Sequence, residues 1–309
     1  MELRQFNKFL NELQDLTEAQ ADKVIDLLRQ RGDGDEVIKL IEQKLQDDPK
    51  CPHCGTAHIR RHGKEHGLQR YRCVECSRSF NALTGTSLAR LRHKDRWLSF
   101  VCSLEQSHSV RKAARSAEIS NSTSFRWRHR FLKFGKTRQK QKLVGIVELD
   151  ESFILASCKG ERGLSRAPRK RGGKAQKAGL SHEQIPILIA RDRYGDEIDV
   201  VLPERTTKAV EAALEGVLDK NEVLLCIDGD PALIAFAEAQ GIDYETVVAS
   251  KGERVHEKVL HLQNVNAKAS RFKQWLARFN GVASKYLQNY LTWQRKLETG
   301  EMPVASATC

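Results

Sequence analysis

The chain has 309 residues, with 52 Lys and Arg against 40 Asp and Glu, which gives a formal net charge of +12. Its hydrophobic content of 40% and charged content of 30% exclude a disordered chain and a membrane protein, and no stretch approaches the roughly 20 apolar residues of a membrane span. The polar N-terminal segment lacks the apolar run of a signal peptide, so we expect a cytoplasmic protein.

The positive charge is concentrated in one part of the chain. Residues 1–50 sum to −4, residues 51–180 to +20 and residues 181–309 to −4. A charge that is confined to one segment is typical of a binding surface. The chain also has eight cysteines, and in a reducing compartment these point to metal binding before disulfides.

Residues 1–48 are predicted to form a small helical module, in which Thr17 to Gln20 has the pattern of a capping box. Residues 49–92 are rich in Cys, His, Arg and Gly and have few large apolar residues, so they need a covalent or metal staple to fold. Two Cys-x-x-Cys pairs, Cys51 with Cys54 and Cys73 with Cys76, predict a zinc ribbon with one structural Zn²⁺. The alternative, four unrelated thiols, leaves their paired spacing unexplained.

Residues 93–140 return to a helical pattern and are predicted to form a helix-turn-helix. Residues 110–117 suit one short helix, and a second helix follows at residues 122–132. Such a helix can read bases from its N-terminal end and hold phosphates with its arginines. We therefore expect DNA contacts from Ser122, Arg126, Arg128 and Arg130. The alternative is a basic helical bundle without sequence recognition.

Residues 141–298 alternate between strand and helix patterns, which predicts an α/β domain around a mixed sheet. Strands are expected at residues 143–155, 185–190, 198–202, 223–227 and 246–249, and helices at 206–218, 231–239 and 263–297. The loop at residues 159–178 has eight basic residues and one acidic residue, so it is either a solvated loop or a DNA-gripping one that includes Arg169, Lys170 and Arg171. Residues 299–309 are a tail.

Acidic residues accompany two of the apolar strands. Asp150 lies within the strand at residues 143–155, and Asp228 directly follows the strand at residues 223–227. Carboxylates at strand ends in α/β sheets commonly bind ligands, and two of them can hold Mg²⁺ for phosphoryl transfer. These residues alone favour a metal-dependent phosphoryl transferase or nuclease, the alternative being helix caps or turn residues.

Taken together, these motifs resemble bacterial insertion-sequence transposases of the ISXO-two-like group, which have an N-terminal zinc ribbon and a DDE-type, ribonuclease-H-like core. The resemblance extends from about residue 18 to about residue 297. It is carried by Cys51-Pro-His-Cys54, Tyr71-Arg-Cys73, Cys76, Glu148-Leu-Asp150-Glu151-Ser152, Ile227-Asp228-Gly229, His261-Leu-Gln-Asn-Val265-Asn266, Arg271-Phe-Lys273, Gly281, Tyr286-Leu287 and Tyr290-Leu291.

The resemblance implies a catalytic set of Asp150, Asp228, Asn266 and Lys273. Asp150, Asp228 and Asn266 would bind two Mg²⁺ or Mn²⁺ ions, with Asn266 at the place that is Glu in most DDE enzymes. Lys273 lies two helical turns further along and would contact DNA phosphate. Since an amide is a weaker ligand than a carboxylate, a neighbouring acid could supply the missing charge. The candidates for that charge are Glu148, Glu151, Asp230 and Glu257.

The sequence thus predicts a transposase that binds terminal inverted repeats of double-stranded DNA and cleaves and joins DNA by two-metal phosphoryl transfer. By resemblance it would act as a homo-oligomer in the bacterial cytoplasm, associated with the nucleoid. One alternative is a catalytically inactive, domesticated DNA-binding protein or repressor. Another is a zinc-ribbon nuclease without a joining step.

Overall fold

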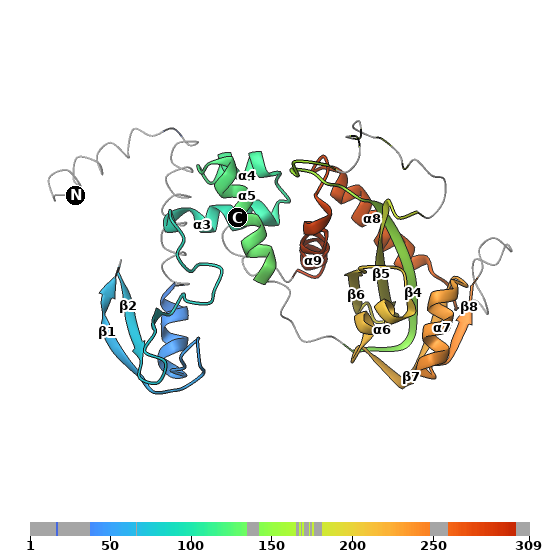
Figure 1. Ribbon diagram of the computed structural model, residues 1–309, viewed down its shortest axis with the longest axis horizontal. Coiled ribbons are helices and arrows are strands. Elements are labelled where there is room, and N and C mark those ends of the chain that lie inside the picture. Colours follow the sequence, from blue (N-terminus) through green and yellow to red (C-terminus); the bar gives the residue numbers. More distant parts are fainter. Residues whose placement is uncertain are drawn as a thin grey trace. The chain divides into compact units, whose positions relative to one another are not determined.

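A computed structural model of the chain describes residues 17, 38–65, 67–134, 142–164, 167, 169, 173, 175, 181–247 and 259–300. The chain divides into two compact units, drawn in Figure 1. Residues 1–134 with 300–309 form the N-terminal unit, and residues 135–299 form the C-terminal unit. Most of the helical module expected at residues 1–48 lies outside the described residues, of which residues 38–47 are helical.

The N-terminal unit begins with a small antiparallel sheet. Its strands follow in chain order as β1 (Ile59–Glu65), β2 (Leu68–Cys73) and β3 (Ser79–Asn81). Only a small core supports this sheet, in which the rings of Tyr71 and Phe80 stack with their centroids 5.8 Å apart beside Cys51 and Cys73. So little apolar burial cannot stabilise a fold of this size without a further constraint.

Helices make up the rest of the N-terminal unit. They are η2 (Lys94–Arg96), α3 (Trp97–Glu105), α4 (Val110–Ser116) and α5 (Asn121–Phe134). Ser109 caps α4 by accepting a hydrogen bond from the Lys112 N–H, as expected of a helix N-terminus. The Ser124 hydroxyl donates to the Val110 carbonyl at 2.9 Å, and Trp127 of α5 packs edge-on against Phe100 of α3. These contacts bind the helices into one bundle.

The C-terminal unit is built on a mixed five-stranded sheet with the order β6-β5-β4-β7-β8. The strands β4, β5 and β6 are antiparallel, whereas β4, β7 and β8 are parallel. The elements are β4 (Leu143–Leu155), β5 (Gln184–Asp192), β6 (Glu197–Val201), α6 (Thr207–Leu214), β7 (Leu218–Ile227), α7 (Pro231–Gln240), β8 (Tyr244–Thr246), α8 (Gln263–Ala277), η4 (Ser284–Tyr286) and α9 (Leu287–Glu298). The expected α/β domain with a mixed sheet is therefore present.

Alternation along β4 directs its side chains to two different layers. Val147 and Leu149 are fully buried in the main core with residues of α6 and α7. Glu148 lies on the opposite face and bonds to the first turn of α8. The sheet thus has helices against both faces, and β4 is placed between them.

The strands differ from the sequence prediction in two places. β7 begins at Leu218 rather than at residue 223, because β4 is long enough to pair Leu143 with Leu218. β8 spans Tyr244–Thr246 rather than residues 246–249, since its register pairs Tyr244 with Leu225 of β7. In both cases pairing with a neighbouring strand decides the boundary.

A buried network of charges joins α8 and α9 to β6. Lys268 is fully buried, and its Nζ lies 2.6 Å from Oε1 of Glu197 and 2.6 Å from Oε2 of Glu298. Arg295 of α9 bonds to the buried Asp199 of β6. Buried charges are tolerated when each has a partner, so this network fixes the helical layer on the sheet.

Candidate catalytic and metal sites

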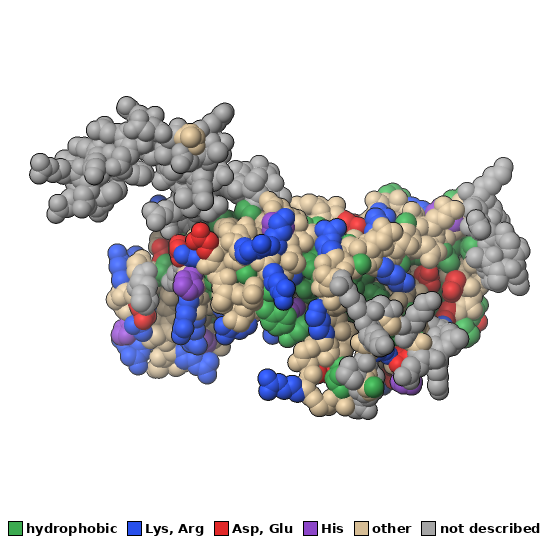
Figure 2. Space-filling view, turned by 90° about the horizontal axis from the view of Figure 1, so that it is seen from above, with side chains coloured by type: hydrophobic (Ala, Val, Ile, Leu, Met, Phe, Trp, Pro, Cys, Tyr) green, Lys and Arg blue, Asp and Glu red, His purple; other side chains and the backbone are tan. Residues whose placement is uncertain are grey.

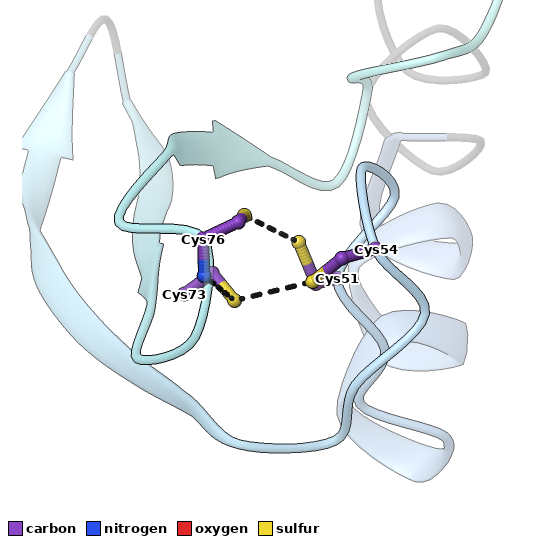
Figure 3. Close-up of side chains that lie close together, drawn as sticks. All are labelled: Cys51, Cys54, Cys73 and Cys76. Carbon is purple, nitrogen blue, oxygen red and sulfur yellow. Dashed lines mark hydrogen bonds between the residues drawn. The ribbon is translucent and has the colours of Figure 1, made fainter.

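Four cysteines of the N-terminal unit converge on one point (Figure 3). Cys51 and Cys54 come from the turn before β1, Cys73 is the last residue of β2, and Cys76 lies in the turn that follows it. The four sulfur atoms lie within 4.8 Å of one another, with 3.7 Å between Cys51 and Cys76 and 3.6 Å between Cys54 and Cys73. Thiolates placed about 2.3 Å from a central zinc ion in a tetrahedron lie about 3.8 Å apart. The site can therefore hold a zinc ion.

The backbone around these cysteines supports a metal site. The His53 N–H points to the sulfur of Cys51, and the Cys76 N–H to the sulfur of Cys73, both at 3.4 Å. Such donors stabilise thiolates, which are the form that binds metal. Gly55 closes the first turn with a φ of 79°, a conformation that favours glycine. In the described part of the chain, this is the one group of three or more His, Cys, Asp or Glu side chains close enough to share an ion.

Basic side chains are exposed on the three-stranded sheet β1–β3 and its cysteine turns, which together are called the ribbon. Every residue of β1 after Ile59 is exposed, including Arg60, Arg61 and Lys64, and Figure 2 shows Lys and Arg side chains on this part of the unit. Arg72 of β2 is half-buried. This part of the +20 segment therefore presents its charge to solvent.

The four residues expected to contact DNA from α5 divide into two groups. Ser122 and Arg126 are exposed on the first turns of the helix, where a ligand can reach them. Arg128 is fully buried and donates from Nη2 to the His108 carbonyl at 2.6 Å, so the expectation of a phosphate contact is wrong for this residue. Arg130 is half-buried and bonds to the Ala89 carbonyl.

The basic loop is described only in part. Arg169 donates to the Ala156 carbonyl at 2.7 Å and lies 2.5 Å from Oε1 of the buried Glu183, with 18% of its side chain exposed. Its guanidinium is thus occupied within the C-terminal unit. Lys170 and Arg171 lie outside the described residues.

Asp150 and Asp228 come together where the pairing of β4 with β7 ends. Glu148 pairs with Cys226 and Leu149 with Ile227 in this parallel ladder. Asp150 is the next residue of β4, which continues to Leu155, and Asp228 directly follows β7. The pKa of Asp150 is raised to about 6, first by burial and then by the nearby Asp228 carboxylate, while the Lys273 ammonium opposes both. Desolvation also raises the pKa of Asp228, against the opposing charge of Arg205. Two carboxylates that repel each other in this way are a suitable donor set for a divalent cation.

The other two residues of the expected catalytic set lie on α8. Asn266 is exposed in its second turn, and Lys273 is exposed two turns later. Residues seven apart share one face of a helix, and the charge of Lys273 reaches Asp150.

The alternative acidic ligands are already engaged in other contacts. Arg205 donates from Nε to Oε2 of Glu151 at 2.7 Å and forms a second ion pair with Asp230. Asp230 also accepts the Ala232 N–H, so this acidic residue is the N-cap of α7. Glu148 is bonded to α8, and Glu257 lies outside the described residues. Asp150 and Asp228 each accept one backbone N–H with Oδ1, from Glu151 and Asp230 respectively, and each keeps its second oxygen for another ligand. Oε1 of Glu151 is also buried without a hydrogen-bond partner among the described residues.

Arg205 and Arg193 are the residues of this region that sequence reasoning did not identify. Arg205 lies between β6 and α6 in a segment without a motif, and Arg193 lies in the turn between β5 and β6. Each reaches an acidic residue of β4 that is more than 40 positions away in the chain. Only the fold brings these pairs together.

Residues 142–294, which span almost the whole C-terminal unit, match the ISXO2-like transposase domain. A protein of Halobacterium salinarum described as an uncharacterized protein in transposable element ISH50 is 29% identical over 258 residues, which cover 82% of this chain and 86% of that protein.

Among solved structures, the Mos1 transposase paired-end complex with left transposon end is 14% identical with a TM-score of 0.24, over 68% of this chain and 80% of that chain. The Mos1 strand transfer complex is 15% identical with a TM-score of 0.24, over 68% and 78%. These scores are too low to support a shared fold. No helix in the described part of the chain is long and apolar enough to cross a membrane. The domain match and the relative both support an insertion-sequence transposase of the ISXO2 group.

Proposed function

We propose that this chain is a transposase that binds the terminal inverted repeats of its element and catalyses metal-dependent cleavage and strand transfer of DNA. The observation that carries the proposal is the pair of carboxylates, Asp150 and Asp228, which directly follow the last paired residues of the parallel strands β4 and β7. The raised pKa of both aspartates indicates a site that is short of positive charge. The mixed sheet around them supports a ribonuclease-H-like core.

The N-terminal unit would provide DNA binding. Four cysteines would hold one structural Zn²⁺, and the exposed arginines and lysine of β1 would contact phosphates. The α4–α5 pair would act as a helix-turn-helix in which Ser122 and Arg126 face the DNA. Arg128 has no part in this surface because it is buried.

The C-terminal unit would provide the chemistry. Asp150, Asp228 and the amide oxygen of Asn266 would hold two Mg²⁺ or Mn²⁺ ions, which when bound supply a nucleophile at neutral pH and neutralise charge on the reacting phosphate. Lys273 would orient the DNA backbone beside Asp150, and Arg205 would keep Glu151 and Asp230 neutralised. Catalysis would then consist of positioning and charge compensation around an in-line displacement.

Cleavage of inverted-repeat DNA by full-length protein with Mg²⁺ or Mn²⁺ tests the carboxylate assignment. Asp150→Ala and Asp228→Ala should each abolish cleavage while leaving binding of the repeat DNA unchanged. Asp243→Ala is the matched control, since Asp243 is an exposed aspartate of the same unit at the start of β8. Wild-type cleavage by either active-site variant would refute the assignment.

The homo-oligomeric state expected of such enzymes belongs to the same proposal. Two DNA ends must be held together for joining, and a single chain carries one candidate active site. Light scattering of the protein bound to repeat DNA should give a mass of at least two chains for each complex. A complex with one chain on one end would contradict it.

A further inference from the structure

Glu148 is a buried carboxylate on the same strand as Asp150, and its hydrogen bonds from backbone and side-chain amides all come from the first turn of α8. Its side chain is 1% exposed. Oε2 accepts the backbone N–H groups of Asn264 at 2.8 Å and Val265 at 3.1 Å, and Oε1 accepts the side-chain amide of Asn264 at 2.6 Å. The Nδ1 atom of His261 lies 3.2 Å from Oε1. Both oxygens are therefore in use, which excludes Glu148 as a substitute metal ligand.

Arg193 completes this arrangement from the turn between β5 and β6. Its Nη1 pairs with Oε1 of Glu148, and its Nη2 donates to the Val259 carbonyl at 2.9 Å. The guanidinium also lies within 3.3 Å of both ring nitrogens of His261. One arginine thus holds the carboxylate and the segment that leads into α8.

The chemistry of these contacts suits a fixed helix start. The first N–H groups of a helix have no partner within the helix, and a carboxylate that accepts them is also favoured by the helix dipole. A buried carboxylate is costly unless its hydrogen bonds are satisfied, and here a guanidinium, two backbone amides and a side-chain amide satisfy it. The sequence alone offers Glu148 as a candidate for extra negative charge at the metal site. That role would require none of these contacts.

We propose that Glu148 and Arg193 form a clamp whose role is to position α8, and through it Asn266, against Asp150. Asn266 directly follows Val265, the second of the two amides that bond to Glu148, while Asp150 lies two residues after Glu148 on the same face of β4. The clamp therefore joins the strand that bears the first ligand to the helix that bears the third. This inference rests on the proposed function for the identity of the ligands.

A neutral ligand makes such a clamp important. An amide oxygen has no charge with which to attract a cation from a distance, so its contribution depends on being held in place beforehand. Residues behind metal ligands typically change metal affinity by about 10- to 100-fold when they are replaced.

Amide hydrogen exchange on the full chain tests the clamp itself. In Glu148→Gln and Arg193→Lys, we expect the amides of Asn264 and Val265 to exchange about tenfold faster or more than in the wild type, because the carboxylate that accepts them is lost or released. Asp192→Asn and Arg191→Lys are matched controls. Asp192 is a buried carboxylate that accepts backbone N–H groups in the same hairpin, and Arg191 pairs with Glu197. Unchanged exchange in both clamp variants would overturn the proposal.

Mn²⁺ affinity, measured by electron paramagnetic resonance on zinc-loaded full-length protein, tests action through Asn266. Glu148→Gln and Asn266→Ala should each weaken Mn²⁺ binding about tenfold or more, and the double variant should bind no more weakly than Asn266→Ala alone. Effects that add in the double variant would show that Glu148 does not act through Asn266. If the coupling is present but the wild type cleaves no DNA, the clamp stands and the proposed activity fails.

Discussion

The three-stranded sheet of the N-terminal unit and the C-terminal unit are stabilised in different ways. The ribbon, which contains this small sheet, has a core of four buried residues, two of which are cysteines of the candidate metal site, whereas the C-terminal unit has a cluster of 16 buried hydrophobic residues between its sheet and α6 and α7. A metal can replace apolar burial in a small fold, but a catalytic site needs a scaffold that is rigid before any ligand arrives. The difference predicts that each unit can be damaged with little effect on the other.

Loss of the ribbon metal should have the largest effect. Cys73→Ser removes one of four thiolates, and a structural zinc site contributes on the order of 10 kcal/mol to folding. We expect the ribbon to unfold while the C-terminal unit keeps its thermal transition, as measured by hydrogen exchange and calorimetry. Cys158→Ser, a replacement at a half-buried cysteine outside the cluster, is the control and should leave the ribbon folded. Unfolding of both units together would contradict their independence.

The converse experiment creates a cavity in the core of the C-terminal unit by mutation. Leu149 is fully buried beside the catalytic strand positions, and Leu149→Ala should lower the free energy of unfolding of this unit by about 2–5 kcal/mol. The zinc content of the protein should stay at the wild-type value, which atomic absorption can measure. A loss of zinc from Leu149→Ala would contradict the prediction that one unit can be damaged with little effect on the other.

The burial of Asp150 and its repulsion by Asp228 should appear in the pH dependence of stability. Because the pKa of Asp150 is raised to about 6 in the folded protein, above the 3.8 of a free aspartate, the ionised form destabilises the fold. The protonated carboxyl of Asp150 contributes fully to the stability of the fold below pH 4. This contribution is lost as the pH rises through about 6. Without divalent metal, Asp150→Asn should therefore raise the free energy of unfolding at pH 7.5 by on the order of 1–3 kcal/mol.

Urea titrations of the wild type and Asp150→Asn across pH 4 to 8 measure this difference. Below pH 4 the two proteins should be equally stable. Added Mg²⁺ should remove the wild-type penalty, since a bound cation neutralises the same charge. Equal stability of the two proteins at every pH would mean that Asp150 is not an electrostatically strained residue.

The smallest effect is expected on the DNA-binding surface. Arg126→Ala removes one exposed cation from α5, so it should weaken DNA binding modestly and lower the slope of log affinity against log salt by about 1. Arg128→Ala should instead destabilise the helical bundle, because it leaves the His108 carbonyl without its guanidinium donor. Fluorescence anisotropy at several salt concentrations distinguishes the two variants. An equal loss of salt slope in both would show that Arg128 does reach DNA.

Local patterns predicted the parts of this molecule that depend on neighbours in the chain. The cysteine spacing predicted the cluster of Cys51, Cys54, Cys73 and Cys76, and the strand pattern placed Asp150 within one apolar strand and Asp228 directly after another. The match to a transposase domain supports the family, while the roles of Asp150, Asp228, Asn266 and Lys273 stay predictions.

Contacts between distant segments could not be predicted in this way. Arg128 was expected on a DNA-facing surface, because a basic helix alone does not say which side packs inward. Glu148 is one of four candidates for a spare charge at the metal site when the sequence alone is considered, since its partners Arg193 and Asn264 lie 45 and 116 positions away. A charged residue in a strand therefore indicates that a partner exists but not which partner it is.

Strand transfer is the measurement that tests the central claim most directly. Purified full-length protein, Mg²⁺ or Mn²⁺, repeat-ended donor DNA and a target plasmid should give covalently joined products with wild type and none with Asp228→Ala. Cleavage without joined products would identify a nuclease. Binding to the repeats without any cleavage would identify a DNA-binding protein in which the acidic pair has no catalytic role, and it would contradict the account.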